Sequence, residues 1–368
     1  MALPAVDAPD GSVAAAASLL EAGECACYSR FYLASIDTCA WIPHLVAVTE
    51  NGLNLGVVYA KERKFAGMPT GLVYADATIG SMVVAEPEYR ERVFELAIRH
   101  LIMRPGFRGL RIVAPPGGYE HQVIERMAAP SRFDLRSAPI ESHSVLDLPS
   151  SYESFVASLG PRTRRNIRYY RRRFETIGEF VPEIPFPEFE LVAMRMIKQS
   201  VVGAQPNRVE RCLRMLSTAA RPFLAGLRTL TGEFLSILGG WYDADRAVII
   251  FQMNNERDHL EKSLSLVARG FLIETLIKNG VGSLLFWGGA GPPLDRYCHF
   301  LPAIRIQLNS RGWGWMALRR IAALAAPFLP RRLAEFASWI ETDPEAPGLP
   351  SAAAISANHD EQAIHPSR

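Results

Sequence analysis

The sequence predicts an α/β (α+β) protein of two tandem domains, each built from a mixed, mostly antiparallel sheet flanked by helices. The length is the first reason, because 368 residues at about 150 per domain allow two domains and a tail. The composition is the second, since 49% hydrophobic and 21% charged residues are typical of globular chains and exclude disordered and collagen-like ones. The third is an order of elements that occurs twice: hairpin strands, a strand, a loop, a helix and a final strand.

The first pass of this pattern covers residues 44–116. Alternating apolar residues on both sides of Asn51-Gly52 predict a hairpin over 44–65, since this dipeptide favours a tight turn between strands. Residues 80–102 predict a strand, a proline-containing loop and a helix, and 109–116 predict a buried strand ended by prolines.

The second pass covers residues 225–289. Turns are predicted at Thr231-Gly232 and at Asp243–Asp245, so 225–255 should form consecutive antiparallel strands. The remaining elements of this pass are a loop over 256–268, a helix over 269–280 and a buried strand over 282–289. The predicted organisation is an N-terminal segment (1–30), a first domain (31–148), a second domain (149–330) and a largely disordered tail (331–368).

Cysteine usage and hydropathy predict a cytoplasmic protein. Five irregularly spaced cysteines favour reduced thiols, and the alternative is a metal site at Cys25-x-Cys27. The chain begins without the basic residues of a signal peptide, and no apolar run reaches the roughly 18 residues of a transmembrane helix. Residues 311–333 carry five arginines and no acid, so they either pack as a terminal helix or bind peripherally to the inner membrane.

One segment is strongly basic although the net charge is only +2, from 40 Lys+Arg and 38 Asp+Glu, which excludes a strongly basic nucleic-acid binder. Residues 162–173 contain seven arginines and no carboxylate. Pro161 suits a first helical turn, so a helix over 161–174 is predicted. At about 100° per residue, four of its side chains should share one side: Arg164, Arg168, Arg171 and Arg172. Because like charges at this spacing repel, the helix either has an anionic partner or is a solvated face. Candidate partners are a coenzyme phosphate, an anionic polysaccharide, a nucleotide-linked substrate, RNA or lipid headgroups.

Four segments occur in an order that we recognise. Ser158 precedes an arginine-rich helix with the core Arg164-Arg165-Asn166-Ile167-Arg168. Three further segments follow: LRTLTGEFLSILGG (227–240), SLSLVARGFLIETLIKNG (263–280) and LLFWGGAGPPLDRYCHF (284–300). In this order they resemble the acetyltransferase family named after the cellulose-biosynthesis protein CelD (CelD/BcsL), which belongs to the GNAT superfamily and is related to the FemAB transferases. The resemblance covers roughly residues 40–310.

The resemblance implies two tandem GNAT-like acyltransferase domains. It also implies acyl transfer from acetyl-CoA, without a metal, to an amine or hydroxyl of a sugar-linked or small acceptor in exopolysaccharide biosynthesis. Two positions depart from the family pattern: an acid is replaced by Leu285, and the lysine after the tyrosine is replaced by Cys298. These departures imply either a different acceptor or an inactive site.

The implied chemistry assigns candidate residues. A GNAT fold holds the donor's pyrophosphate on backbone N–H groups before a helix, and the nearest segment is Ser265, Leu266, Val267, Ala268, Arg269 and Gly270, where Arg269 would meet a phosphate. Tyr297 is the candidate general acid for the leaving thiolate, and His299 or Glu261 the candidate base. The candidate substrate-binding residues are Arg165, Arg168, Asp243, Gln252 and Trp287. For each of these the alternative is a structural role; in particular, Trp287 either stacks on a sugar or packs in the core.

Two rival functions remain open. A FemAB-like transferase would use aminoacyl-tRNA, and the arginine helix would then bind RNA; otherwise nucleic acid is not an expected partner. A non-catalytic, degenerate GNAT protein would dock at the membrane through 311–333. Covalent catalysis by Cys298 is disfavoured, because neighbouring residues such as Cys298 and His299 do not face each other in a strand or helix.

Overall fold

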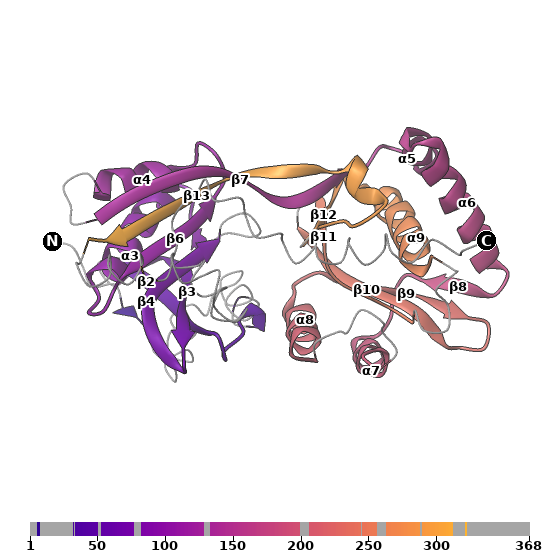
Figure 1. Cartoon of the computed structure of the whole chain (residues 1–368), viewed down its shortest axis with the longest axis horizontal. Helices are drawn as coiled ribbons and strands as arrows, with labels where there is room; N and C mark the ends of the chain where they lie inside the picture. The colour runs from indigo at the N-terminus through magenta and orange to yellow at the C-terminus, as the bar shows by residue number, and fades with distance from the viewer. Residues whose placement is uncertain are drawn as a thin grey trace. The chain divides into compact units, whose positions relative to one another are not determined.

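The chain forms two compact units in the computed structural model (Figure 1). The described residues are 6–7, 32, 34–50, 53–76, 82–128, 133–198, 206–243, 245–255, 263–287, 289–311 and 321. The first unit takes in the described residues of 1–29, 36–142 and 302–349, and the second takes in those of 30–35 and 143–301. Strand β13 (His299–Ser310) therefore divides between the units, because its residues 304–309 pair with a strand of the first unit. The sequence predicts residues 299–310 to lie in the second domain (149–330), and these domain bounds stay a prediction.

The first unit is a mostly antiparallel sheet with two helices on one face. Its strands are β1 (Val6–Asp7), β2 (Trp41–Glu50), β3 (Leu53–Phe65), β4 (Met68–Asp76), β5 (Val83–Ala85), β6 (Gly109–Ala114) and the end of β13, with β7 (Phe133–Asp147) leading out. Its helices are α3 (Arg90–Met103) and α4 (Tyr119–Ala128). The sheet order is β1-β2-β3-β4-β6-β13, with β5 on β3, and β4 and β6 are parallel. Apolar residues at helical spacing on α3, among them Val93, Ala97 and Leu101, are fully buried against this sheet.

The second unit is a sheet covered by helices on both faces. Its helices are α5 (Tyr152–Ser158), α6 (Pro161–Glu175), α7 (Phe186–Met196), α8 (Pro206–Thr218), α9 (Leu264–Lys278) and the short 3-10 helix η2 (Leu294–Tyr297). Its strands are β8 (Gly178–Val181), β9 (Pro222–Thr229), β10 (Phe234–Asp243), β11 (Arg246–Asn254), β12 (Ser283–Phe286) and the last residues of β7. The sheet order is β7-β12-β11-β10-β9-β8.

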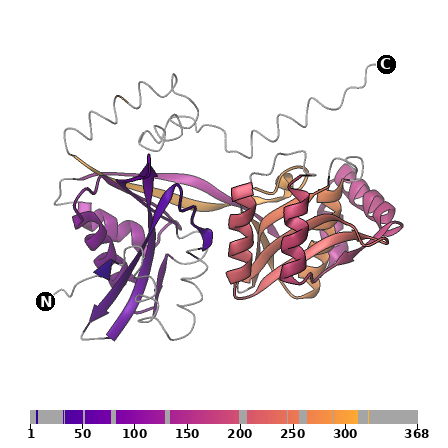
Figure 2. The same ribbon diagram turned by 90° about the horizontal axis from the view of Figure 1, so that it is seen from below.

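Two separate cores hold the second unit together. On one face, α5, α6 and α9 bury Phe155, Ile167 and Ile273 against the sheet. On the other face, α7 and α8 bury Phe189 and Leu213, and Figure 2 shows these two helices side by side across the sheet. Because both faces are covered, β10 is buried continuously from Phe234 to Gly240 instead of alternating.

Most predicted elements are confirmed. The hairpins of β2–β3, β9–β10 and β10–β11 turn where the sequence indicated, and α6 spans the predicted basic segment. One boundary is wrong: α9 begins at Leu264, so residues 264–268 are helical and not a loop. The reason is burial, since Leu264, Leu266 and Val267 pack into the core and the helix can bury them only by starting earlier. The predicted segment 311–333 and the tail lie outside the described residues except Arg311 and Ile321.

Candidate functional site

The candidate site is the place where two parallel strands of the second unit stop pairing. Strands β11 and β12 pair in parallel from Arg246–Ser283 to Ile249–Phe286, where β12 ends, while β11 continues to Asn254. The register of β11 against β10 shifts here, because Gly239 pairs with Phe251 and Gly240 with Ile249. This leaves Ile250 as the extra residue of a bulge, which bends β11 away from its parallel partner.

Glycine is needed at this bulge. A side chain on Gly240 would collide with the carbonyl oxygen of Val248 and the ring of Phe223. The close backbone approach at Gly240 therefore depends on the absence of a Cβ atom. Carboxyl ends of neighbouring parallel strands are where α/β folds bind ligands. Nine residues, 255–263, connect the end of β11 at Asn254 to the start of α9 at Leu264.

Arg269 of α9 reaches across the separated strands. Its Nε donates to Gln252 Oε1 of β11 at 2.7 Å, and its Nη1 donates to the backbone carbonyl of Ala290, which follows β12. The guanidinium also lies 5.3 Å from the ring centre of Phe286. Burial lowers the pKa of Arg269 to about 10. Within the described part of the chain no carboxylate forms an ion pair with Arg269, so this cation is held by neutral acceptors only.

The six residues predicted to hold the donor's phosphates lie in the first two turns of α9. Leu266, Val267, Ala268 and Gly270 are buried, and Ser265 is half-buried with its carbonyl oxygen 3.4 Å from the Gln252 amide. The preceding Ser263 has a left-handed φ of 46° and makes no capping hydrogen bond with its side chain. The first-turn N–H groups of α9 are therefore not satisfied by a side-chain cap at Ser263. Arg269 is the one charged residue of this segment, and its guanidinium contacts both separated strands or the residues that follow them.

The structure places Tyr297 at the amino end of α6. Its hydroxyl accepts a hydrogen bond from the Gly160 N–H at 2.9 Å and donates to Thr163 Oγ1 at 3.1 Å. Both groups can donate to the phenolate, the Thr163 hydroxyl by turning its O–H toward it, so these hydrogen bonds, that with Thr163 first, lower the pKa of the Tyr297 phenol. A phenol with a lowered pKa is suited to donating a proton near neutral pH.

The other predicted catalytic residues differ in their surroundings. His299 is 52% exposed at its side chain, and its Nδ1 lies 3.4 Å from Asp147 Oδ2. Glu261 lies outside the described residues. Burial, and then the nearby carboxylate of Asp295, raise the pKa of the Cys298 thiol to about 11, and its Sγ donates to the Leu294 carbonyl. A thiol with such a pKa is protonated at neutral pH, which argues against a cysteine nucleophile.

The predicted substrate-binding residues fall into three places. Gln252 contacts Arg269, as described above. Asp243 forms an ion pair of 2.5 Å with Arg246 at the opposite end of β11, so the structure does not bring it near Gln252. Trp287 is 40% exposed and lies 5.8 Å from the rings of both His143 and Trp241. This aromatic cluster was missed by sequence reasoning, because its three members come from β7, β10 and the end of β12.

The arginines of α6 separate onto two sides. Arg171 faces inward, where it pairs with Glu274 of α9 at 2.5 Å and with Glu175 at 3.1 Å, and lies 4.0 Å from the ring centre of Phe271. The prediction that Arg171 shares a face with Arg164, Arg168 and Arg172 is therefore wrong. The physical reason is that α9 supplies a carboxylate and an aromatic ring on the inner side of α6.

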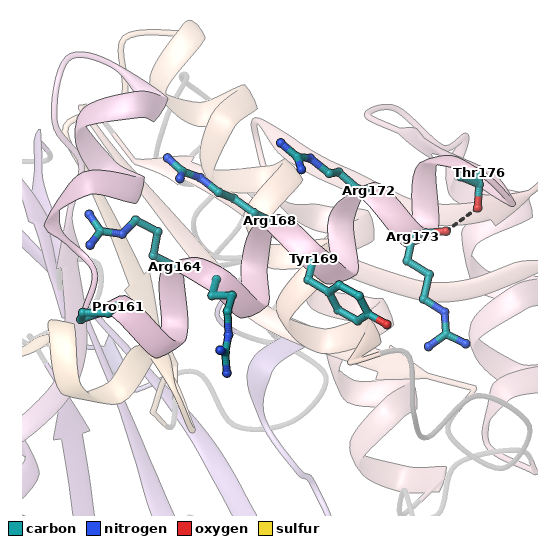
Figure 3. Close-up of a pocket in the computed structure, with 8 residues that line it drawn as sticks. Pro161, Arg164, Arg168, Tyr169, Arg172, Arg173 and Thr176 are labelled. Carbon is teal, nitrogen blue, oxygen red and sulfur yellow. Dashed lines mark hydrogen bonds between the residues drawn. The ribbon is translucent and has the colours of Figure 1, made fainter.

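The outer side of α6 carries two rows of side chains along an open surface pocket (Figure 3). Residues four apart lie above one another on a helix, so the outer row is Arg164, Arg168 and Arg172, and the second row is Arg165, Tyr169 and Arg173. Arg168 and Arg172 are exposed and make no ion pair or hydrogen bond with any described residue, as is true of Arg165 in the second row. Arg164 donates only to the carbonyl of Ala157. The predicted binding residues Arg165 and Arg168 thus belong to an exposed basic face, on which neither of them has an ion pair with a described residue.

Two kinds of site are absent from the described residues. No group of three or more His, Cys, Asp or Glu side chains is placed to hold a metal ion there. No helix among them has the length and apolar character needed to cross a membrane.

Comparison with known proteins identifies the fold. No protein-family model matches the chain, and no curated protein sequence is similar to it. Among solved structures, FemX superimposes with a TM-score of 0.54 at 9% identity, over 74% of this chain and 90% of FemX. L-PGS from Bacillus licheniformis superimposes with a TM-score of 0.52 at 10% identity, over 93% of this chain and all (100%) of L-PGS. The C-terminal domain of a putative lysylphosphatidylglycerol synthetase from Agrobacterium fabrum gives a TM-score of 0.50 at 13% identity, over 85% and 95%.

At such low identity these likenesses show the fold alone. The predicted α/β fold class, two units of mixed, mostly antiparallel sheets flanked by helices, is confirmed, and FemX and L-PGS share this fold. The assignment to the GNAT superfamily stays a prediction. The narrower assignment to the CelD/BcsL family stays a prediction.

Proposed function

We propose that the chain is a GNAT-type acyltransferase that transfers an acyl group from acyl-CoA, such as acetyl-CoA, to an amine or hydroxyl of a sugar-linked or small acceptor. The observation that carries this proposal is Arg269, an internal cation without a carboxylate partner in the described chain, at the point where β11 and β12 separate. An internal charge without a counter-ion is costly, so a fold that keeps one has a use for it.

The residues present fit an anionic acyl donor. Arg269 would pair with a phosphate, and the first-turn N–H groups of α9, which the Ser263 side chain does not cap, offer further donors for anionic oxygens. Acyl-CoA would supply an activated thioester carbonyl and a thiolate leaving group. In the proposed reaction Tyr297 protonates the thiolate, because its phenol already has a lowered pKa.

The acceptor needs a base and a surface that binds it. His299, paired with Asp147, is the proposed base among the described residues, and Glu261 remains the other candidate. The exposed ring of Trp287, beside Trp241, offers an apolar surface for a sugar ring. We also propose that the reaction takes place in the cytoplasm and serves exopolysaccharide biosynthesis, as the CelD resemblance implies.

Thermal unfolding of the purified chain tests the donor. A ligand at one hundred times its dissociation constant stabilises the folded state by about 2.7 kcal/mol, which raises the midpoint by several degrees in a chain of this size. We expect that rise with acetyl-CoA and not with ATP at equal concentration. Arg269→Met should abolish the rise, while Arg195→Gln, which removes an exposed arginine from α7, should retain it. Absence of a shift with millimolar acetyl-CoA would sink the acyl-CoA proposal.

The basic face of α6 favours a second candidate, transfer from aminoacyl-tRNA. Five arginines of the two outer rows and the exposed Tyr169 are groups that contact phosphates and stack on bases. This candidate predicts tRNA binding that weakens steeply between 50 and 200 mM salt, by about 10³- to 10⁵-fold if six to ten phosphates are contacted. Binding that is absent, or insensitive to salt, would remove it.

A further inference from the structure

The bulge of β11 decides which way Gln252 points. Ile249, before the bulge, packs in the core that α5, α6 and α9 cover. Simple alternation along the strand would place Phe251 on the same face, but Phe251 and Met253 pack in the core that α7 and α8 cover. The extra residue of the bulge shifts the alternation by one, so Gln252 faces α9 instead and reaches Arg269.

The amide of Gln252 joins two groups of α9. Its Oε1 accepts the Nε–H of Arg269 at 2.7 Å, and its Nε2 donates to the carbonyl oxygen of Ser265 at 3.4 Å. The contact with Ser265 fixes how the amide is turned, because a carbonyl oxygen can accept only from the amide nitrogen. The amide oxygen is therefore directed at Arg269, and it holds the guanidinium from the Nε side.

The contacts of Arg269 leave one edge of its guanidinium without a partner in the described chain. Gln252 takes the Nε–H, the carbonyl of Ala290 takes one N–H of Nη1, and the Cζ atom lies 5.3 Å from the ring centre of Phe286. No hydrogen bond joins Nη2 to a described residue. The two terminal nitrogens of a guanidinium match two oxygens of a phosphate or carboxylate. All three contacting groups are neutral, so the positive charge remains for a ligand at this edge.

We propose that Gln252 is a positioning residue, which turns the Nη1–Nη2 edge of Arg269 toward an anionic ligand of the phosphate class and, being neutral, leaves the charge of Arg269 to that ligand. This role differs from the contact with the acceptor that the sequence predicts for Gln252. It rests on the proposed function for the identity of the ligand, which would be the phosphates of an acyl-CoA. The orientation of Arg269 and the neutrality of its partner are separable by mutation.

Two variants separate orientation from charge, with isothermal titration of acetyl-CoA and of inorganic pyrophosphate as the measurement. Gln252→Met keeps the size of the side chain and loses the hydrogen bond to Arg269, so both probes should bind about tenfold more weakly. Gln252→Glu keeps an acceptor for the Nε–H but pairs the guanidinium with a carboxylate, so binding should weaken by about a hundredfold. In the background Arg269→Met, neither change at Gln252 should weaken binding further.

Nuclear magnetic resonance of the chain labelled with 15N-arginine reports the orientation without any ligand. The Nε–H signal of Arg269 is identified by its loss in Arg269→Met. In the native chain this hydrogen should exchange slowly with solvent, since it is donated to Gln252. We expect fast exchange in Gln252→Met and slow exchange in Gln252→Glu. A role in stability alone would not retain the slow exchange while losing ligand binding, as Gln252→Glu should.

The matched control is Gln122→Glu, which adds the same charge at an exposed position of α4 and should change the affinity less than twofold. Unchanged affinity in both Gln252 variants, or slow exchange of the Arg269 signal in Gln252→Met, would overturn the proposal. If pyrophosphate binds through Arg269 and acetyl-CoA does not bind, the acyl-CoA donor is wrong while the role of Gln252 still stands on the pyrophosphate titrations. If neither probe binds through Arg269, both proposals fail.

Discussion

The charged clusters of the two units differ in how they are compensated. In the first unit Glu62 is buried, lies 3.0 Å from His44 Nε2, accepts the Gly71 N–H at 2.7 Å and lies 3.7 Å from Arg104. In the second unit Arg269 and the outer row of α6 have no carboxylate partner among the described residues. The first cluster contains its own counter-ion, whereas the second set of charges has none in the described chain. Under the proposed function, the presence of a counter-ion therefore separates structural charges from binding charges better than burial does.

Removing the Glu62 charge is expected to have the largest effect on stability. Glu62→Gln leaves His44 and Arg104 without their anion in a site where both His44 and Glu62 are about 5% exposed. Breaking one partner of a buried ion pair costs about 3 kcal/mol, and chemical denaturation measures the loss. A cost below about 1 kcal/mol would contradict the view that this cluster is structural.

The same cluster predicts a pH dependence. Burial alone would raise the pKa of Glu62, but the His44 hydrogen bond and the Gly71 N–H outweigh it and lower the pKa. A carboxyl group with a lowered folded-state pKa stabilises the fold above its unfolded pKa, and this contribution is lost as the pH falls through the folded-state pKa. The free energy of unfolding of the native chain should therefore fall more steeply below about pH 4.5 than that of Glu62→Gln, where this carboxyl is absent.

The inner side of α6 provides the next test. Arg171→Gln removes the ion pairs with Glu274 and Glu175 and the stacking on Phe271. Because Arg171 and Glu274 are each about 20% exposed, the expected cost is about 2 kcal/mol, less than for a fully buried pair. Chemical denaturation gives the free energy of unfolding of Arg171→Gln, of Glu274→Gln and of the double variant. Comparing the three with the native chain gives the interaction energy between Arg171 and Glu274.

A smaller effect on stability is expected at Tyr297. Tyr297→Phe removes the hydroxyl that accepts the Gly160 N–H, so α6 loses a cap worth about 1 kcal/mol. If the phenol also protonates the leaving thiolate as proposed, kcat falls by about 10²- to 10⁴-fold. Thr163→Val, which loses the second hydrogen bond but retains the phenol, is the control that should keep most of the activity.

The smallest effect on stability should come from the outer row. Arg168→Gln should change the free energy of unfolding by less than about 0.5 kcal/mol, because Arg168 has no partner to lose in the described chain and its removal relieves repulsion. Polyanion binding should nevertheless weaken. If Arg168→Gln lowered the free energy of unfolding as much as Arg171→Gln does, the two sides of α6 would not differ as described.

Local sequence signals predicted most of the elements and the basic helix. Asn51-Gly52, Thr231-Gly232 and Asp243–Asp245 mark turns because their backbone preferences act within a few residues. Pro161 marks the start of α6 for the same reason. The start of α9 was misjudged because its polar-to-apolar transition near Ser263 resembles a loop, and only burial against the sheet extends the helix to Leu264.

The sequence by itself determined that the chain folds as tandem α/β units, and that residues 162–173 of one helix contain seven arginines and no carboxylate. Tertiary structure alone decided which arginine is neutralised, since the partner of Arg171 lies more than one hundred residues away at Glu274. The hydrogen bond between Gly160 and Tyr297 joins residues 137 apart, so the periodicity of the sequence could not predict it either. The physical reason is that periodicity reports which side of an element is buried, whereas counter-ions and hydrogen-bond partners depend on which distant element packs there.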